Sequence, residues 1–375
     1  MKQFANEGEY LIHLVICAMK GEQPLEMPEG LDFEKVYSLA CYHSLANIAY
    51  YGIEKLSRKP EEELLRKWSQ VRDKAIIKDL TQQNEYEQIA TMLSEEKMWF
   101  IPLKGMILKR YYPQSDFRTM SDIDLLIDEA NAPVAKKVMF SLGYEVERYG
   151  AGAHDVYLKK PVMNVEIHRQ LFGVHAGREY NQIFRNILEL CNQSSEYCYE
   201  MEINTFFVYM IAHAAKHYDH GGTGLRSFLD IWVFLKKFQE QLDWSRIDEM
   251  LQVEDMQEKC HDFMQLTWIF FEDAPCDGKY EEMKAFVMHA GTYGTLKEMV
   301  QQDIQKKGKA GYVFRQIFPT VEMMKSNFPI LKKASVLLPF VWLYRLLVKP
   351  VVNYQKTKKK LQTLMGYQKD DKSNL

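Results

Sequence analysis

The sequence predicts an α+β fold in which a small mixed or antiparallel sheet is flanked by N-terminal and C-terminal helical regions. Apolar residues recur at helical spacing through residues 1–95 and again through residues 201–330. Between them, residues 96–200 contain short runs in which apolar and polar residues alternate, as in half-buried strands. A last region, residues 331–375, is first apolar and then basic, and it ends in a tail. We expect these four regions to be the domains of the chain.

The N-terminal region is expected to be helical throughout. Tyr10 and Leu14 fall on one face of a first helix, and a second helix is expected at Phe33–Leu56. Pro60 and the three glutamates after it are typical of a helix start, because proline suits the first turn and acids suit the positive end of the helix dipole. That third helix is expected to continue to about Glu95.

The middle region is expected to form the sheet. Its predicted strands are Trp99–Leu103, Ser121–Asp128, Tyr144–Arg148, Val156–Lys159 and Val162–Arg169. Its predicted helices are Met106–Tyr112 and Ala130–Leu142, the second of which ends at Gly143. The loop between the last two strands is short, which indicates a hairpin and excludes a purely parallel sheet.

From about Tyr180 onward the pattern predicts helices again. One of them carries His213 and His217 and ends at Gly221–Gly224, and the next begins at about Phe228. The glycine run has no strand before it and no Gly-Lys-Ser/Thr after it, so we interpret it as a turn between helices rather than a phosphate loop.

Composition narrows the classes of function. The 48 lysines and arginines nearly balance the 51 aspartates and glutamates, giving a net charge of −3. This balance argues against a dedicated nucleic-acid binder and against long nucleic acid as a partner, but it leaves room for a nucleotide. The six cysteines include no Cys-x-x-Cys pair, so we interpret them as free thiols of a cytoplasmic protein.

The most informative segment is Ser121–Asp128. Asp122 and Asp124 share one face of the predicted strand, while the isoleucines and leucines between them face the opposite way. Two carboxylates held side by side repel each other unless a cation lies between them. The segment therefore predicts a Mg²⁺ site, and Mg²⁺ sites built from a few carboxylates usually act on phosphates.

Other residues in the middle region could complete such a site. Glu166 alternates with apolar residues in its own strand, so it becomes a third carboxylate if that strand lies beside the first one. Three carboxylates around two metals suit in-line displacement at phosphorus. Lys104 and Gly105 begin a predicted helix, whose start favours anions, and Arg118 is a candidate clamp for phosphate.

These residues resemble the nucleotidyltransferase superfamily with the DNA polymerase-β-like palm, and most of all the bacterial group labelled nucleotidyltransferase family protein. The resemblance spans about residues 80–240. It is carried by Leu103-Lys104-Gly105, by Arg118 with Ser121–Ile127, by Gly143-Tyr144, and by Val165-Glu166-Ile167-His168. It implies a palm at about residues 96–200, in which Asp122 and Asp124 are paired metal ligands and Glu166 is the third carboxylate.

The resulting hypothesis is a Mg²⁺-dependent nucleotidyltransferase that moves an NMP group from an NTP to a hydroxyl, with a two-metal site. The acceptor is expected to be a small molecule or a protein. One departure from the family pattern motivates an alternative: Lys104-Gly105-Met106 stands where the superfamily usually has glycine followed by serine. The alternative is a non-catalytic nucleotide-binding or interaction protein on the same fold.

Histidines near the site have several interpretations. His213, His217 and His220 share one helix face, so they could hold zinc, form a wall of the nucleotide site together with Lys216, or simply pack. His168 shares a strand face with Glu166, which makes it a better candidate for phosphate or nucleotide binding than His154.

Residues 334–352 are very apolar but contain Pro339, Arg345 and Pro350. A transmembrane span needs about 20 apolar residues without an internal arginine. Two interpretations remain, burial against the helical region or peripheral contact with a membrane, for which the flanking lysines are suited.

Overall fold

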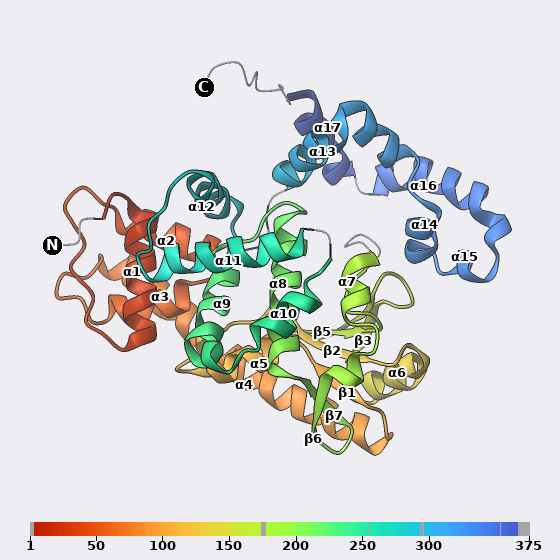
Figure 1. Ribbon diagram of the computed structural model, residues 1–375, viewed down its shortest axis with the longest axis horizontal. Helices are drawn as coiled ribbons and strands as arrows, with labels where there is room; N and C mark the ends of the chain where they lie inside the picture. Colours follow the sequence, from red (N-terminus) through yellow and green to blue (C-terminus); the bar gives the residue numbers. More distant parts are fainter. Residues whose placement is uncertain are drawn as a thin grey trace.

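The computed structural model describes residues 4–173, 178–253, 255–292, 294, 296–352 and 354–366. One mixed sheet of seven strands lies among helices, which confirms the predicted α+β class (Figure 1). Across the sheet the strand order is β3-β4-β5-β2-β1-β7-β6. The strands are β1 (Phe100–Pro102), β2 (Ile123–Ile127), β3 (Glu145–Arg148), β4 (His154–Lys159), β5 (Met163–His168), β6 (Cys191–Ser195) and β7 (Cys198–Met201).

The helices fall into three groups along the chain. Before the sheet lie α1 (Glu7–Lys20), α2 (Phe33–Tyr42), α3 (Ala46–Ile53) and α4 (Glu62–Glu95). Between the strands lie α5 (Lys104–Leu108), α6 (Ala132–Ser141) and α7 (Arg178–Ile183). After them come α8 (Ile203–Tyr218), α9 (Leu225–Phe238), α10 (Trp244–Met250), α11 (Met256–Phe271), α12 (Lys279–Ala290), α13 (Leu296–Ile317), α14 (Val321–Asn327), α15 (Ile330–Lys333), α16 (Leu338–Val352) and α17 (Tyr354–Gly366).

The centre of the sheet joins the segments that the sequence singled out. β2 runs parallel to β5, with Asp124 opposite Glu166 and Leu126 opposite His168. β4 and β5 form the expected antiparallel hairpin, in which His154 lies opposite His168. β1 pairs antiparallel with β2 and parallel with β7, so the sheet is mixed.

The two faces of the sheet have different partners. Leu125 of β2 and Ile167 of β5 belong to a hydrophobic cluster that also contains residues of α4 and α6. Because side chains alternate along a strand, Asp124 and Glu166 point to the other face. α8 and α9 lie over that face, and they close a cavity with it. The alternation therefore separates a dry core on one side from a polar site on the other.

Two predictions of secondary structure are wrong. The single helix expected at Phe33–Leu56 is two helices, because Ser44 has a φ of 55° and a residue in that conformation cannot continue a right-handed helix. The helical region expected from about Tyr180 instead contains the hairpin of β6 and β7. β6 is an edge strand with mostly exposed polar side chains, so it lacks the apolar alternation that signals a strand.

Helices α13 to α17 form an arm beside the rest of the protein (Figure 1). The arm contacts the sheet region where the backbone N–H of Gly152 donates to the carbonyl of Ser326 and where Lys332 pairs with Glu129.

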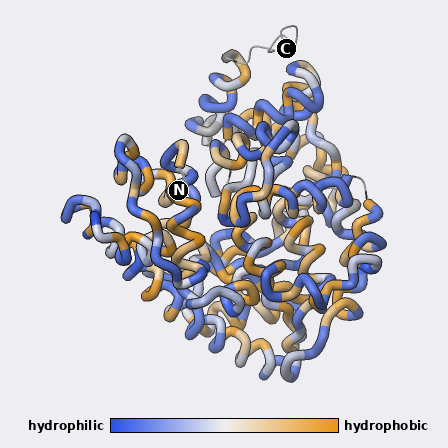
Figure 2. The backbone as a smooth tube through the Cα atoms, turned by 60° about the vertical axis from the view of Figure 1, so that its left-hand side comes forward, coloured by the Kyte–Doolittle hydropathy of each residue, from blue (hydrophilic) through white to orange (hydrophobic). Residues whose placement is uncertain are grey.

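Hydrophobic segments recur along the helices next to the C-terminus (Figure 2). Several large side chains of residues 334–348 are exposed, among them Phe340 at 71% and Leu347 at 63%, whereas Trp342 is half-buried. Among the described residues, no helix combines the length and apolar character needed to cross a bilayer.

Candidate functional site

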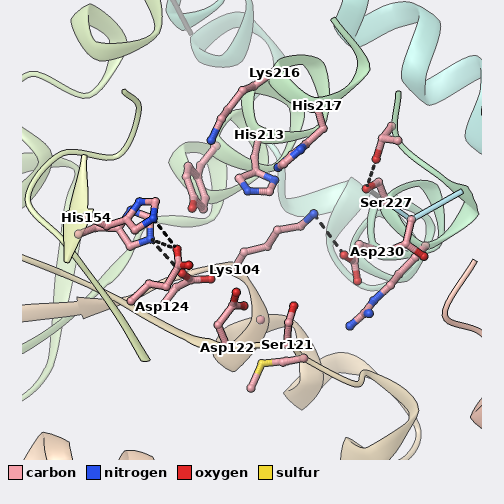
Figure 3. Close-up of a pocket in the computed structure, with 18 of the residues that line it drawn as sticks. Lys104, Ser121, Asp122, Asp124, His154, His213, Lys216, His217, Ser227 and Asp230 are labelled. Carbon is pink, nitrogen blue, oxygen red and sulfur yellow. Dashed lines mark hydrogen bonds and ion pairs between the residues drawn. The ribbon is translucent and has the colours of Figure 1, made fainter. Parts of the chain in front are cut away.

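A cavity of about 450 Å³ lies between the sheet and helices α8 and α9. All ten residues that the sequence proposed for the site line it, although they come from four separate stretches of the chain. They are Lys104, Gly105, Arg118, Asp122, Asp124, Glu166, His168, His213, Lys216 and His217. Three of the acids lie on the strand side of the cavity, and a fourth, Asp230, comes from α9 on the opposite side (Figure 3). Basic groups come from α8, from the segment after β1 and, through Arg226, from α9.

Three carboxylates meet on the strand side. Asp124 of β2 and Glu166 of β5 are direct neighbours in the parallel register, and Asp122 immediately precedes β2. Burial, followed by the negative charges of Asp124 and Glu166, raises the pKa of Asp122 to about 7. Burial and the charge of Asp124 also raise the pKa of Glu166. Carboxylates that line one cavity from adjacent strands offer oxygen ligands to a divalent cation.

Two histidines are in contact with these acids. His168 Nε2 lies 2.9 Å from Asp124 Oδ1, and His154 Nε2 lies 3.0 Å from Glu166 Oε2 (Figure 3). Burial alone would raise the pKa of Asp124, but the hydrogen bond from His168 and the nearby basic groups outweigh it and hold the pKa below its usual value. Among the described residues, His154, Glu166 and His168 form a group suited to hold a metal ion. The sequence pattern ranks His154 below His168 as a candidate for the site.

The acids lead to a prediction about pH in the metal-free protein. The pKa of Asp122 is near 7 in the folded chain and has a reference value of 3.8, so the folded state holds this proton more tightly than the unfolded state. Asp122 therefore makes the free energy of unfolding fall as pH rises from about 4 to about 7. Asp122→Asn removes this loss. Urea denaturation should find the variant increasingly more stable than wild type across that window, and a constant difference would contradict the assignment.

On the opposite side, the basic residues converge on a buried carboxylate that the sequence analysis missed. Asp230 of α9 is 1% exposed and accepts from Arg118 Nε at 2.7 Å and Arg118 Nη2 at 2.9 Å. Lys104 Nζ lies 3.3 Å from Asp230 Oδ2, and the Tyr112 hydroxyl donates to Asp230 Oδ1 at 2.8 Å. Burial would raise the pKa of Asp230, but Arg118 and Lys104 hold it below its usual value. The sequence feature that could have identified Asp230 is its position as a single aspartate within the apolar run after Phe228.

Helix α8 supplies the remaining wall. His213, Lys216 and His217 extend from it toward the cavity (Figure 3). Burial, followed by the charge of Lys216, lowers the pKa of His217 to about 3, so its ring is neutral near pH 7. His220 lies outside the cavity lining, and its Nδ1 contacts the carbonyl of Lys216. The metal-binding group found among the described residues does not include these three histidines, so nothing favours the zinc interpretation for them.

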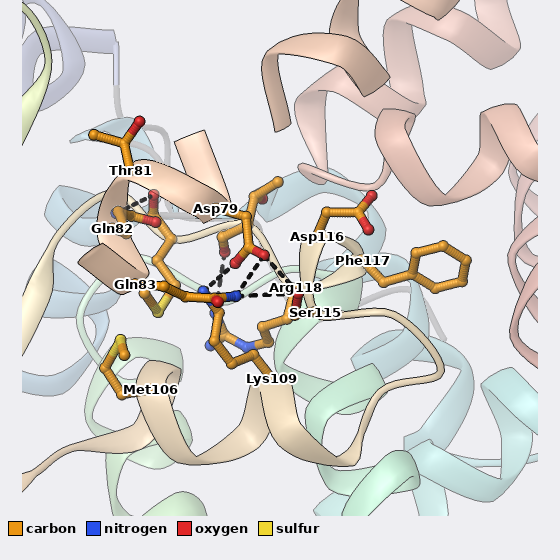
Figure 4. Close-up of polar contacts among 12 residues, drawn as sticks. Asp79, Thr81, Gln82, Gln83, Met106, Lys109, Ser115, Asp116, Phe117 and Arg118 are labelled. Atoms are coloured by element: carbon orange, nitrogen blue, oxygen red, sulfur yellow. Dashed lines mark hydrogen bonds and ion pairs between the residues drawn. The ribbon is translucent and has the colours of Figure 1, made fainter. Parts of the chain in front are cut away.

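A second buried network fixes the segment that carries Arg118. Asp79 of α4 forms an ion pair with Lys109 and accepts hydrogen bonds from Gln83 and Ser115 (Figure 4). Asp79 and Lys109 are both buried, so neither charge is solvated by bulk water. The network therefore ties residues 109–118 to the long helix on the far side of the sheet.

This network yields a stability prediction. Asp79→Ala should lower the free energy of unfolding by about 3 kcal/mol, because it leaves Lys109 as a buried charge without its carboxylate. The double variant Asp79→Leu with Lys109→Met should recover much of the loss, since it removes both charges. Urea denaturation of both proteins tests this. A double variant that is less stable than Asp79→Ala would contradict the explanation.

No curated protein matches this chain. A solved structure, that of the antibiotic-resistance factor ANT(2'')-Ia, aligns with 10% identity and a TM-score of 0.33, covering 46% of this chain and 90% of that one. That score is too low to support an inference. A family described as uncharacterised nucleotidyltransferases matches residues 29–272, which is more than half of the chain and includes the whole cavity-bearing sheet. The protein therefore belongs to this nucleotidyltransferase family.

Proposed function

We propose that the protein is a Mg²⁺-dependent nucleotidyltransferase that transfers an NMP group from an NTP to a hydroxyl of a small molecule or a protein. The observation that carries the proposal is the convergence of Asp122, Asp124 and Glu166 on a cavity whose other walls carry basic groups. The acids fit Mg²⁺, because hard dications prefer carboxylate oxygens. The pKa of Asp122 is raised by burial and then by the charges of Asp124 and Glu166, and a bound cation would offset that repulsion. Mg²⁺, when bound, would neutralise charge on the triphosphate and on the leaving pyrophosphate.

The residues have distinct roles in this proposal. Asp122 and Asp124 hold the metal, and Glu166 accepts the proton of the acceptor hydroxyl, for which its raised pKa is suited. The hydroxyl oxygen forms a bond to the α-phosphorus, the bond from that phosphorus to its bridging oxygen breaks, and pyrophosphate leaves. His168 orients Asp124 through its hydrogen bond.

The triphosphate would lie along the basic wall. Lys216 with His213 and His217 faces the cavity from α8, while Lys104 and Arg118 are oriented by Asp230. Because their carboxylate partner is buried, these two cations keep a fixed position and do not have to be ordered when the nucleotide binds. The superfamily usually has a serine after the glycine of this loop, but here Met106 follows Gly105, so we propose that Lys104 takes over the contact with the triphosphate.

The alternative, a nucleotide-binding protein without turnover, is favoured by one observation. The charges of Lys104 and Arg118 are partly neutralised by Asp230, which weakens their pull on a triphosphate. This protein would bind NTP with Mg²⁺ but form no product. Calorimetry followed by product analysis separates the two functions.

The proposed function is tested by measuring the transfer of an NMP group. The protein is incubated with Mg²⁺, each of the four NTPs labelled at the α-phosphorus, and fractions of a cell extract as a source of acceptors. Wild type should release pyrophosphate and move label to an acceptor, and Asp122→Asn should not. Asp128→Asn, on the exposed far end of the same segment, is the matched control and should keep activity. Equal transfer by wild type and Asp122→Asn would reject the proposal.

We further propose a cytoplasmic location with peripheral contact to anionic membrane through residues 334–352. All six cysteines are free, which suits a reducing compartment. Phe340 and Leu347 of α16 are exposed, and the exposed Lys332 and Lys333 lie just before that helix. Apolar side chains next to lysines favour the surface of a membrane with acidic lipids.

Liposome flotation tests this contact. The full chain should float with vesicles that contain acidic phospholipid and much less with neutral vesicles, because the lysines attract acidic headgroups. Truncation before Ala334, or Phe340→Glu with Leu347→Glu in the full chain, should abolish flotation. Leu80→Glu is the matched control, since Leu80 is 61% exposed on α4. Undiminished flotation of both altered proteins would contradict the proposal.

A further inference from the structure

Four metal-binding atoms form a row across three adjacent strands of the cavity floor. His154 Nε2 of β4 lies 3.0 Å from Glu166 Oε2 of β5. That oxygen lies 3.8 Å from His168 Nε2, which in turn lies 2.9 Å from Asp124 Oδ1 of β2. The strand register accounts for the row, because His154 pairs with His168 and Asp124 pairs with Glu166.

The spacing of these atoms matches a coordination shell. Metal–nitrogen and metal–oxygen bonds of roughly 2.1 Å place neighbouring ligands of a tetrahedral ion about 3.4 Å apart. The ligand atoms of His154, Glu166 and His168 all lie within 4.8 Å of one another, so small side-chain movements would bring them around one ion. Each of the three is held by a strand, which limits how far it must move.

We propose that His154, Glu166 and His168 bind a transition-metal dication, so that one of the two metal positions prefers such an ion to Mg²⁺. When this ion binds, His168 Nε2 exchanges its hydrogen bond to Asp124 for the metal, and Glu166 keeps its second oxygen to accept the proton of the acceptor hydroxyl. Two imidazoles with one carboxylate form the donor set of catalytic zinc and non-haem iron sites, whereas Mg²⁺ is bound almost entirely by oxygen. The inference deepens the proposed function by naming the class of metal at the same site, and it rests on that function for its role in transfer. Asp122 and Asp124 supply oxygen ligands for the neighbouring position.

Arg148 is expected to weaken metal binding at this site. Its guanidinium contacts His154 Nε2, the same nitrogen that the metal would need, and its positive charge would repel the ion. Removing this group should therefore strengthen metal binding. If the two histidines served only to hydrogen-bond the carboxylates, loss of Arg148 would leave metal affinity unchanged or weaken it.

The test uses Mn²⁺ as the probe on the metal-free full-length protein. Electron paramagnetic resonance measures free Mn²⁺ during a titration, and the pulsed experiment detects nitrogen nuclei bonded to the ion. Wild type should bind Mn²⁺ at least about 100-fold more tightly than Mg²⁺ and show nitrogen coupling that changes with ¹⁵N-histidine labelling. Bound Mn²⁺ without nitrogen coupling in wild type would overturn the inference, and this result needs no variant.

Substitutions identify the histidines that supply the nitrogen ligands of the ion. His168→Ala and His154→Ala should each weaken Mn²⁺ binding by about 100-fold or more, while Arg148→Gln should strengthen it. His220→Ala is the matched control, because this histidine is exposed and lies outside the cavity lining. Unchanged Mn²⁺ affinity in both histidine variants would overturn the inference. Nitrogen coupling in a wild-type protein that transfers no NMP would instead reject the proposed function and leave the metal site standing.

Discussion

Asp230→Ala is expected to lower the free energy of unfolding by about 5 kcal/mol, more than the loss expected for Asp79→Ala. The carboxylate is buried and accepts two hydrogen bonds from Arg118, one from Tyr112 and an ion pair from Lys104. Its removal leaves two positive groups close together in a site with little water, where their repulsion and lost hydrogen bonds add to the cost of burial. Urea denaturation measures the change.

Two further variants serve as controls for Asp230→Ala. Asp230→Asn should fall between wild type and alanine, because the amide oxygen still accepts a hydrogen bond but carries no charge. Glu249→Ala, an exposed acid on the nearby helix α10, should change stability by less than about 0.5 kcal/mol. A loss below about 1 kcal/mol for Asp230→Ala would contradict its role as the anchor of the basic wall.

Asp124→Asn is expected to have the largest effect on activity, a loss of about a thousandfold or more in NMP transfer. Asp124 lies on β2 directly opposite Glu166 of β5, so it is next to a second acid of the site. The hydrogen bond from His168 favours its ionised form. The amide has the same shape but lacks the charge that holds a divalent cation. Steady-state transfer measured at saturating Mg²⁺ and NTP tests the prediction.

Stability and activity should separate in Asp124→Asn. The variant removes a charge that His168 and nearby basic groups stabilise, so the metal-free protein should lose a modest part of its stability but remain folded. A folded variant with near wild-type transfer would show that Asp124 is not a metal ligand. A variant that fails to fold would contradict the electrostatic account of the acid cluster.

The parts of the site that could be predicted from sequence are those set by strand alternation. The order of polar and apolar residues around Asp124 and Glu166 fixes which face each carboxylate occupies, and a buried opposite face leaves no other register. The short loop between the two predicted strands was enough to predict the hairpin of β4 and β5. Local pattern was sufficient there because each strand has one dry face and one polar face.

The parts that could not be predicted depend on contacts between distant segments. Asp230 and Arg118 are 112 positions apart in the chain, and a local sequence pattern does not show which cation a buried carboxylate will pair with. His154 looked like an isolated residue until β4 paired with β5 and placed it beside Glu166. β6 was missed because an edge strand can be polar on both faces, and Ser44 because a single left-handed residue leaves hydrophobic spacing intact.

The central claim is that acids from β2 and β5 and basic groups from α8, α9 and the segment after β1 form one site for a divalent cation with a triphosphate. Calorimetry with an NTP analogue whose α–β bridge is a methylene tests it without an acceptor. Wild type should bind the analogue tightly with Mg²⁺ and weakly with chelator, and Asp124→Asn should lose most of the effect of the metal. Binding that is equal with and without Mg²⁺, or unaffected by Asp124→Asn, would contradict the claim.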